Sequence, residues 1–122
     1  MAKVLRAIRG ATTLDSDTPE QVHTRTQALV REMLELNGVE NDDLVSIIFT
    51  STEDVTSAFP ATAARELNLS DIALLGAREA TVPGAPQRCI RVLMHCYSEL
   101  DRDKLQHVYL EGAVNLRADL RR

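Results

Sequence analysis

Residues 88–97, RCIRVLMHCY, predict a long strand within a sheet, because apolar and β-branched side chains dominate the run. On a period of two, Arg91 shares one face of this strand with Cys89 and Leu93. A guanidinium keeps its charge, and taking an unpaired charge out of water costs several kcal/mol. The fold around this strand must therefore supply Arg91 with an anionic or polar partner.

Four further strands are expected from period-two patterns and β-branched runs, at residues 3–12, 43–51, 71–76 and 107–110. In the first of these, Arg9 falls on the same face as Leu5 and Ala7. Arg9 thus repeats the situation of Arg91, a cation among small or apolar neighbours. Residues 76–79 are expected to lead out of the strand at 71–76.

One long helix has a clear start, with Thr18 as N-cap and Pro19 at the first helical position. It is expected to run to about Asn37, where Asn37-Gly38 supplies a left-handed stop. Seven residues at helical spacing form its expected inner stripe: Val22, Thr26, Leu29, Met33 and Leu36, widened by Val30 and Leu34.

A short helix is expected at residues 61–67, opened by Pro60, and the tail at 111–122 could form another. The resulting fold class is α/β (α+β), a mixed five-stranded sheet with one long and one short helix in a single domain, residues 1–122. So few helices cannot cover both faces of a sheet. The uncovered face is expected to pack against other copies of the chain in a closed homo-oligomer.

The composition is that of an ordinary globular protein, with 122 residues, 44% of them apolar and a net charge of −4. This charge and the four aromatic residues argue against a nucleic-acid partner. The sequence shows no signal peptide or membrane-spanning run. Cys89 and Cys96 are seven residues apart in one strand and cannot bridge each other, which favours a cytoplasmic location.

Several kinds of chemistry have no candidate residues. His23, His95 and His107 are scattered without metal-ligand spacing, and no phosphate loop or activated nucleophile is visible. We therefore expect no metal and no cofactor. Arginines dominate what remains: Arg9 and Arg91 fit a ligand carboxylate, whereas for Arg65 or Arg117 alone a solvated or ion-paired surface position is favoured over a ligand role.

Two other polar residues have open roles. Tyr109 is a possible hydroxyl donor, although a lone strand tyrosine is more often a core or interface residue. Glu79 could be a surface acid, an ion-pair partner, or a carboxylate that faces a ligand hydroxyl. The residues alone thus predict a basic pocket for a small dianionic molecule in a cofactor-free oligomer.

Four ordered blocks resemble one family, the monofunctional AroH-type chorismate mutases: RAIRGATT, TEDVTSAFPATAAREL, RCIRVLM and HVYLEGAVNLRADL. The resemblance runs nearly end to end. It implies a homotrimer with a pseudo-α/β-barrel core, active sites between subunits, chorismate as the small-molecule substrate, and rearrangement of chorismate to prephenate.

The resemblance also implies residue roles. Arg91 would lie against the ether oxygen of chorismate, Glu79 against the ring hydroxyl, and Arg9 with Tyr109 against a carboxylate. The remaining positions would line or rim the pocket: Phe59, Ala61, Arg65, Leu74, Leu75, Leu116 and Arg117.

The chain departs from the family pattern at the periphery. Thr62 stands in place of a lysine, Leu75 in place of a threonine, Gly76 in place of a cysteine, Gln106 in place of an arginine and Ala118 in place of a proline. None of these is among the four central positions. Two alternatives remain: a trimeric imine deaminase-like enzyme, and a non-catalytic trimer that binds an anionic metabolite.

Overall fold

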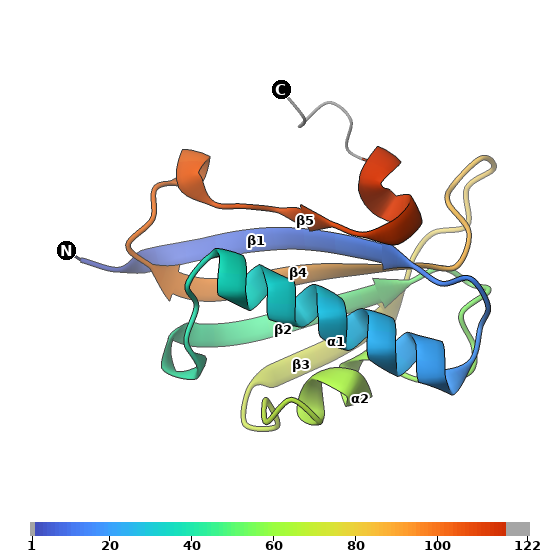
Figure 1. Ribbon diagram of the computed structural model, residues 1–122, viewed down its shortest axis with the longest axis horizontal. Coiled ribbons are helices and arrows are strands. Elements are labelled where there is room, and N and C mark those ends of the chain that lie inside the picture. Colours follow the sequence, from blue (N-terminus) through green and yellow to red (C-terminus); the bar gives the residue numbers. More distant parts are fainter. Residues whose placement is uncertain (1, 117–122) are drawn as a thin grey trace.

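The computed structural model describes residues 2–116, which form one five-stranded mixed sheet with two α-helices (Figure 1). The strands are β1 (Val4–Thr13), β2 (Leu44–Ser51), β3 (Ala73–Arg78), β4 (Cys89–Ser98) and β5 (Val108–Tyr109). The helices are α1 (Pro19–Leu36), α2 (Pro60–Arg65) and the short 3₁₀ turns η1 (Asn41–Asp43), η2 (Arg102–Lys104) and η3 (Glu111–Asn115). The expected fold class, with one long and one short helix, is confirmed.

The strand order is β3-β2-β4-β1-β5, so the long strand β4 lies in the centre of the sheet. It pairs antiparallel with both β1 and β2, while the outer pairs β2–β3 and β1–β5 are parallel. The arginine-bearing strand therefore has a hydrogen-bonded neighbour on each side. The sequence patterns alone did not predict this order.

Both α-helices lie on one face of the sheet, and they pack against each other and against the strands (Figure 1). Helix α1 begins as expected: the Thr18 hydroxyl accepts a hydrogen bond from the backbone N–H of Gln21 at 3.2 Å. The helix packs closely on β1 at Gly10, where an added Cβ would lie 2.5 Å from the Met33 sulfur. A side chain at Gly10 would therefore require the Met33 side chain to shift.

The inner stripe of α1 is confirmed at five positions: Val22, Thr26, Leu29, Val30 and Met33 are buried. Leu34 packs partly buried against the same core. The prediction for Leu36 is wrong, because this side chain is 45% exposed.

Asn37, the C-cap residue directly after α1, takes the inner position instead. Its side chain donates to the carbonyls of Met33 and Gln106 and accepts from the Gln106 backbone N–H at 2.7 Å. The helix end is thus tied to the approach to β5 by hydrogen bonds. Gly38 follows with φ +60°, the expected left-handed stop.

Strand β3 lies two residues further along the chain than predicted. Gly76, Ala77 and Arg78 were expected to lead out of the strand but belong to it, because they pair with Phe49, Thr50 and Ser51. The ladder continues one step further, since the backbone N–H of Glu79 donates to the Ser51 carbonyl at 2.9 Å. The bounds of β3 are set by its pairing with β2, and the local sequence pattern of β3 contains no information about that pairing.

Within residues 2–116, neither α-helix lies on the second face of the sheet, which we call the open face; Ala113 of η3 packs at one end of it. Leu5 and Tyr97 are cross-strand partners on it and are 54% and 47% exposed. Within residues 2–116, no helix has both the length and the apolar character needed to cross a membrane.

Candidate active site

A cleft of about 270 Å³ lies on the open face, over β1, β2, β4 and β5, and we call it the strand cleft. It is lined by Arg9, Gly10, Ala11, Ile48, Thr50, Arg91, Val92, Leu93 and Tyr109. Three of the predicted site residues, Arg9, Arg91 and Tyr109, thus meet in one cleft although they come from three strands.

The strand register explains this convergence. Ala11 on β1 pairs with Arg91 of β4 on one side and with Tyr109 of β5 on the other. Arg9 follows two residues away on the same strand face and pairs with Leu93. The methyl side chain of Ala11 leaves room between its larger neighbours, so the cleft has a small-residue floor beneath two cations and a phenol.

Glu79 is the partner of Arg91 in the isolated chain. The Arg91 Nε lies 3.1 Å from the Glu79 Oε2, and the two side chains are 42% and 23% exposed. The same Oε2 accepts a hydrogen bond of 2.7 Å from the Thr50 hydroxyl. Of the roles left open for Glu79, the structure shows the ion pair.

The start of β4 is held by a second carboxylate, that of Asp54. It accepts two hydrogen bonds, of 3.0 and 2.9 Å, from the backbone N–H of Arg88, which has a left-handed φ of +47°. Burial opposes ionisation of Asp54, but hydrogen bonds from the Thr52 hydroxyl and from Arg88 hold its pKa below the ordinary value. The strained backbone just before Cys89 is thus fixed three residues from Arg91.

Cys89 lies at the end of the strand cleft and packs with Ala11, Ala113, Tyr109 and Leu116. Burial raises the pKa of its thiol. Cys96 belongs to the helix-side core, so the two free cysteines occupy opposite faces as expected. Leu116 is close to the cleft, whereas Arg117 lies outside the described residues.

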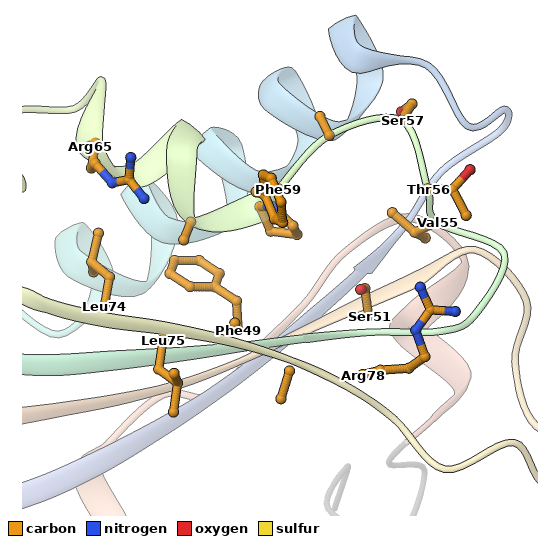
Figure 2. Close-up of a pocket in the computed structure, with 15 residues that line it drawn as sticks. Phe49, Ser51, Val55, Thr56, Ser57, Phe59, Arg65, Leu74, Leu75 and Arg78 are labelled. Carbon is orange, nitrogen blue, oxygen red and sulfur yellow. The ribbon is translucent and has the colours of Figure 1, made fainter.

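A larger cleft of about 640 Å³ lies between α2 and the edge strand β3, on the helix side of the sheet, and we call it the helix cleft (Figure 2). It gathers the other predicted pocket residues: Phe59, Ala61, Arg65, Leu74 and Leu75. The remaining lining residues are Phe49, Ser51, Val55, Thr56, Ser57, Ala58, Pro60, Gly76, Ala77 and Arg78.

Side chains in the helix cleft differ in exposure and direction. Phe59 is 79% exposed, whereas Ala61 is buried in the core. Leu74 points toward α2 and Leu75 toward the opposite side of β3 (Figure 2). Arg65 ends α2 and carries its cation at the rim of the cleft.

The loop before Phe59 is fixed by Asp17. Its carboxylate accepts four hydrogen bonds of 2.7 to 3.2 Å, from the backbone N–H and the hydroxyl of both Thr56 and Ser57. These bonds, the Ser57 hydroxyl foremost, lower the pKa of Asp17 to about 2. Asp17 therefore connects the entry to α1 with one wall of the helix cleft.

The two clefts open on opposite faces of the sheet. Phe49 and Leu74 of the helix cleft belong to or pack against the core beneath the helices, whereas Thr50 and Arg91 line the strand cleft. The predicted site residues are therefore brought together in two groups, with β2 and β3 between them.

Sequence reasoning missed Thr50, Asp17 and Asp54. Thr50 looks like an ordinary β-branched strand residue, and the two aspartates look like ordinary turn residues. Their partners are all distant in sequence except Thr52, which stands two residues before Asp54. Among residues 2–116, no group of three or more His, Cys, Asp or Glu side chains is placed to hold a metal ion.

Comparisons with known proteins agree with the fold. The family model described as chorismate mutase type I matches residues 5–120. The chain is similar to chorismate mutase AroH of Thermus thermophilus, with 49% identity over 96% of this chain and 97% of that protein. The chain is also similar to chorismate mutase AroH of Bacillus subtilis, with 37% identity over 96% of this chain and 93% of that protein. A solved chorismate mutase from Clostridium thermocellum superposes with a TM-score of 0.88 at 48% identity, covering 89% of this chain and 97% of that one.

Proposed function

The chain belongs to the type I chorismate mutase family, and from this premise we propose that it converts chorismate to prephenate with the strand cleft as the chemical centre. The observation that carries the proposal is the meeting of Arg91, Arg9 and Tyr109 in one cleft, with Glu79 against Arg91. Two cations and a phenol suit a dicarboxylate.

The reaction suits a site built from fixed charges. It is an intramolecular rearrangement in which a C–O ether bond breaks while a C–C bond forms, so it requires no proton transfer and no covalent intermediate. In the transition state the ether oxygen gains negative charge and the ring fragment gains positive charge. Groups that bind these charges more strongly in the transition state than in the ground state lower the barrier.

Arg91 is the proposed stabiliser of the ether oxygen. Glu79 Oε2 lies 3.1 Å from the Arg91 Nε, on the stem side of the guanidinium, and the two terminal nitrogens are the proposed donors to the substrate. Those nitrogens are donors of fixed charge and geometry. Losing one well-placed donor to a developing oxyanion typically costs about 2.7–4 kcal/mol of barrier.

The other central residues select the reactive conformer of the substrate. Arg9 and Tyr109 would bind a carboxylate at the β1–β5 side of the cleft, and Glu79 would accept a hydrogen bond from the ring hydroxyl. Binding both ends of chorismate favours the compact conformer in which the reacting carbons approach, which reduces the entropic part of the barrier. Glu79 also balances the positive charge that develops on the ring.

We infer a homotrimer with shared sites, and the placement of the two clefts supports this inference. The strand cleft of one copy would face Phe59, Ala61 and Arg65 of the next copy's helix cleft. Because these surfaces differ, the proposed contact is head-to-tail, and such a contact closes into a ring when the rotation between copies allows it. The exposed Leu5 and Tyr97 of the open face would then be covered in a pseudo-barrel core.

Peripheral residues complete the proposed site. Arg65 and Arg117 would attract the dianion, and Phe59, Leu74 and Leu116 would exclude water, with Leu75 at the cleft wall. Metal and cofactor have no proposed role. The two free, buried cysteines support a reducing compartment, the cytoplasm.

The direct test is to mix the purified protein with chorismate alone and follow the loss of chorismate absorbance. Acid treatment of the product should give phenylpyruvate. A protein that binds chorismate without turnover would support the alternative of an anion-binding trimer. Hydrolysis of an imine substrate, with chorismate left intact, would support the imine deaminase alternative.

A further inference from the structure

We propose that Thr50 is a positioning residue that orients the Glu79 carboxylate for catalysis; this inference rests on the proposed chorismate mutase function. The Thr50 hydroxyl donates to Glu79 Oε2 at 2.7 Å, and the Arg91 Nε lies 3.1 Å from the same oxygen. Both contacts fall on one carboxylate oxygen, but the Nε contact is an ion pair without hydrogen-bond geometry, so the Thr50 hydroxyl makes the directional bond to Oε2. The second oxygen, Oε1, is the proposed acceptor for the substrate.

The sheet fixes every backbone in this arrangement. Thr50 on β2 pairs with Arg91 of β4 on one side and with Ala77 of β3 on the other. Glu79 follows β3 by one residue, and its backbone N–H donates to the Ser51 carbonyl. The carboxylate must therefore extend back across β2 to reach Arg91, and Thr50 is the residue directly beneath that path.

A carboxylate that faces an arginine has two ways to bind it. In the fork-to-fork geometry both oxygens take guanidinium N–H groups, which is strong and would occupy a terminal nitrogen of Arg91. In the observed contact Oε2 meets Nε. A hydroxyl bonded to Oε2 restricts rotation of the carboxylate, and in the proposed role it holds Oε1 toward the substrate instead of toward a second guanidinium nitrogen.

Two catalytic groups benefit from this restriction. A terminal nitrogen of Arg91 stays available for the ether oxygen of the substrate, and Oε1 of Glu79 stays available to accept from the ring hydroxyl. Removing the Thr50 hydroxyl should therefore weaken interactions made in the transition state. The expected signature is a fall in kcat with little change in KM.

The experiment compares four variants by steady-state kinetics with chorismate: Thr50→Val, Thr50→Ser, Glu79→Gln, and the double variant Thr50→Val/Glu79→Gln. Valine keeps the shape and strand preference of threonine but has no hydroxyl. We expect Thr50→Val to lower kcat by about tenfold, the scale of one hydrogen bond to a charged group, with KM within about threefold. Thr50→Ser should recover kcat to within about twofold of wild type, because serine retains the hydroxyl.

The double variant tests whether Thr50 acts through Glu79. In the Glu79→Gln background, loss of the Thr50 hydroxyl should change kcat by less than about twofold. Thr12→Val is the matched control: it removes a buried hydroxyl from β1 that has no hydrogen-bond partner among the described residues, and its kcat should equal that of wild type. Thermal unfolding confirms that each variant is folded, and Thr50→Ala replaces Thr50→Val if the valine variant does not fold.

Two results would overturn the inference. One is a hydroxyl-free variant at position 50 with wild-type kcat and KM; the other is an equal fall in kcat with and without the Glu79 carboxylate. Neither would affect the proposed function, which fails instead if the wild-type protein leaves chorismate unchanged.

Discussion

Glu79 directly follows β3 and Arg91 lies in β4, two strands that are not neighbours, and their side chains meet 3.1 Å apart across β2. This contact answers the question posed by a permanent cation in the central strand. The chain supplies a carboxylate from twelve residues upstream, reached only through the sheet. Because Arg91 remains 42% exposed, the pair still presents a cation to the strand cleft.

Replacing Arg91 should abolish most of the catalysis. We expect Arg91→Ala to lower kcat by at least about 10²–10³-fold, and Arg91→Lys to be severely impaired, since an ammonium lacks the planar fork. Steady-state kinetics with chorismate measures this, with Arg31→Ala, an exposed change on α1, as the control. Arg117→Ala should mainly raise KM. An Arg91→Ala enzyme with near-normal kcat would rule out the assignment.

Two inactive variants should complement each other if sites are shared between copies. Arg91→Ala disables the strand cleft, and Phe59→Glu places an acid at an exposed position of the helix cleft, where it would repel a dianion. In a random mixed assembly, about one quarter of the sites combine two intact halves, so about a quarter of wild-type activity should return. The measurement is activity after co-refolding the two variants. Mixed assemblies detected by native mass spectrometry without recovered activity would contradict shared sites.

Asp17 should make the wild-type protein sensitive to acid in a defined range. Its pKa is about 2 when folded against 3.8 for the ordinary group, so its ionised form stabilises the fold fully above about pH 4. That contribution is lost as the pH falls from about 4 toward 2. Tm measured across this range should fall less steeply for Asp17→Asn than for wild type. Identical slopes would show that the four hydrogen bonds to Asp17 add no pH-dependent stability.

Both thiols should resist modification in the folded protein. Cys89 and Cys96 are buried, and burial raises the pKa of each above its ordinary value, so little reactive thiolate is present at neutral pH. A colorimetric thiol reagent should find two thiols after unfolding in denaturant and almost none before. Rapid reaction of either cysteine in the native protein would show that its surroundings open readily.

Local signals in the sequence predicted local structure well. Three correct predictions depend only on residues within a few positions of one another: the cap at Thr18, the inner stripe of α1 as far as Met33, and the helix stop at Gly38. The prediction for Leu36 was wrong because the inner position at the end of α1 belongs to the C-cap residue Asn37, whose partner Gln106 is remote in sequence.

Long-range pairing was the part that the sequence could not supply. The bounds of β3 follow from its register with β2, and the strand order decides that Arg91 lies between Thr50 and Ala11. The resemblance to a family indicated which residues belong to one site. Only the sheet shows that they divide into two groups on opposite faces, and only the folded chain reveals Thr50.

Under the proposed sharing of sites between copies, the separation of the strand cleft from the helix cleft by β2 and β3 makes turnover depend on how many chains are present. Activity per chain should be constant at high protein concentration and should decline on dilution, once the copies dissociate faster than they find one another. A cell that makes only a few of these chains would gain almost no prephenate from them, however well each one folds.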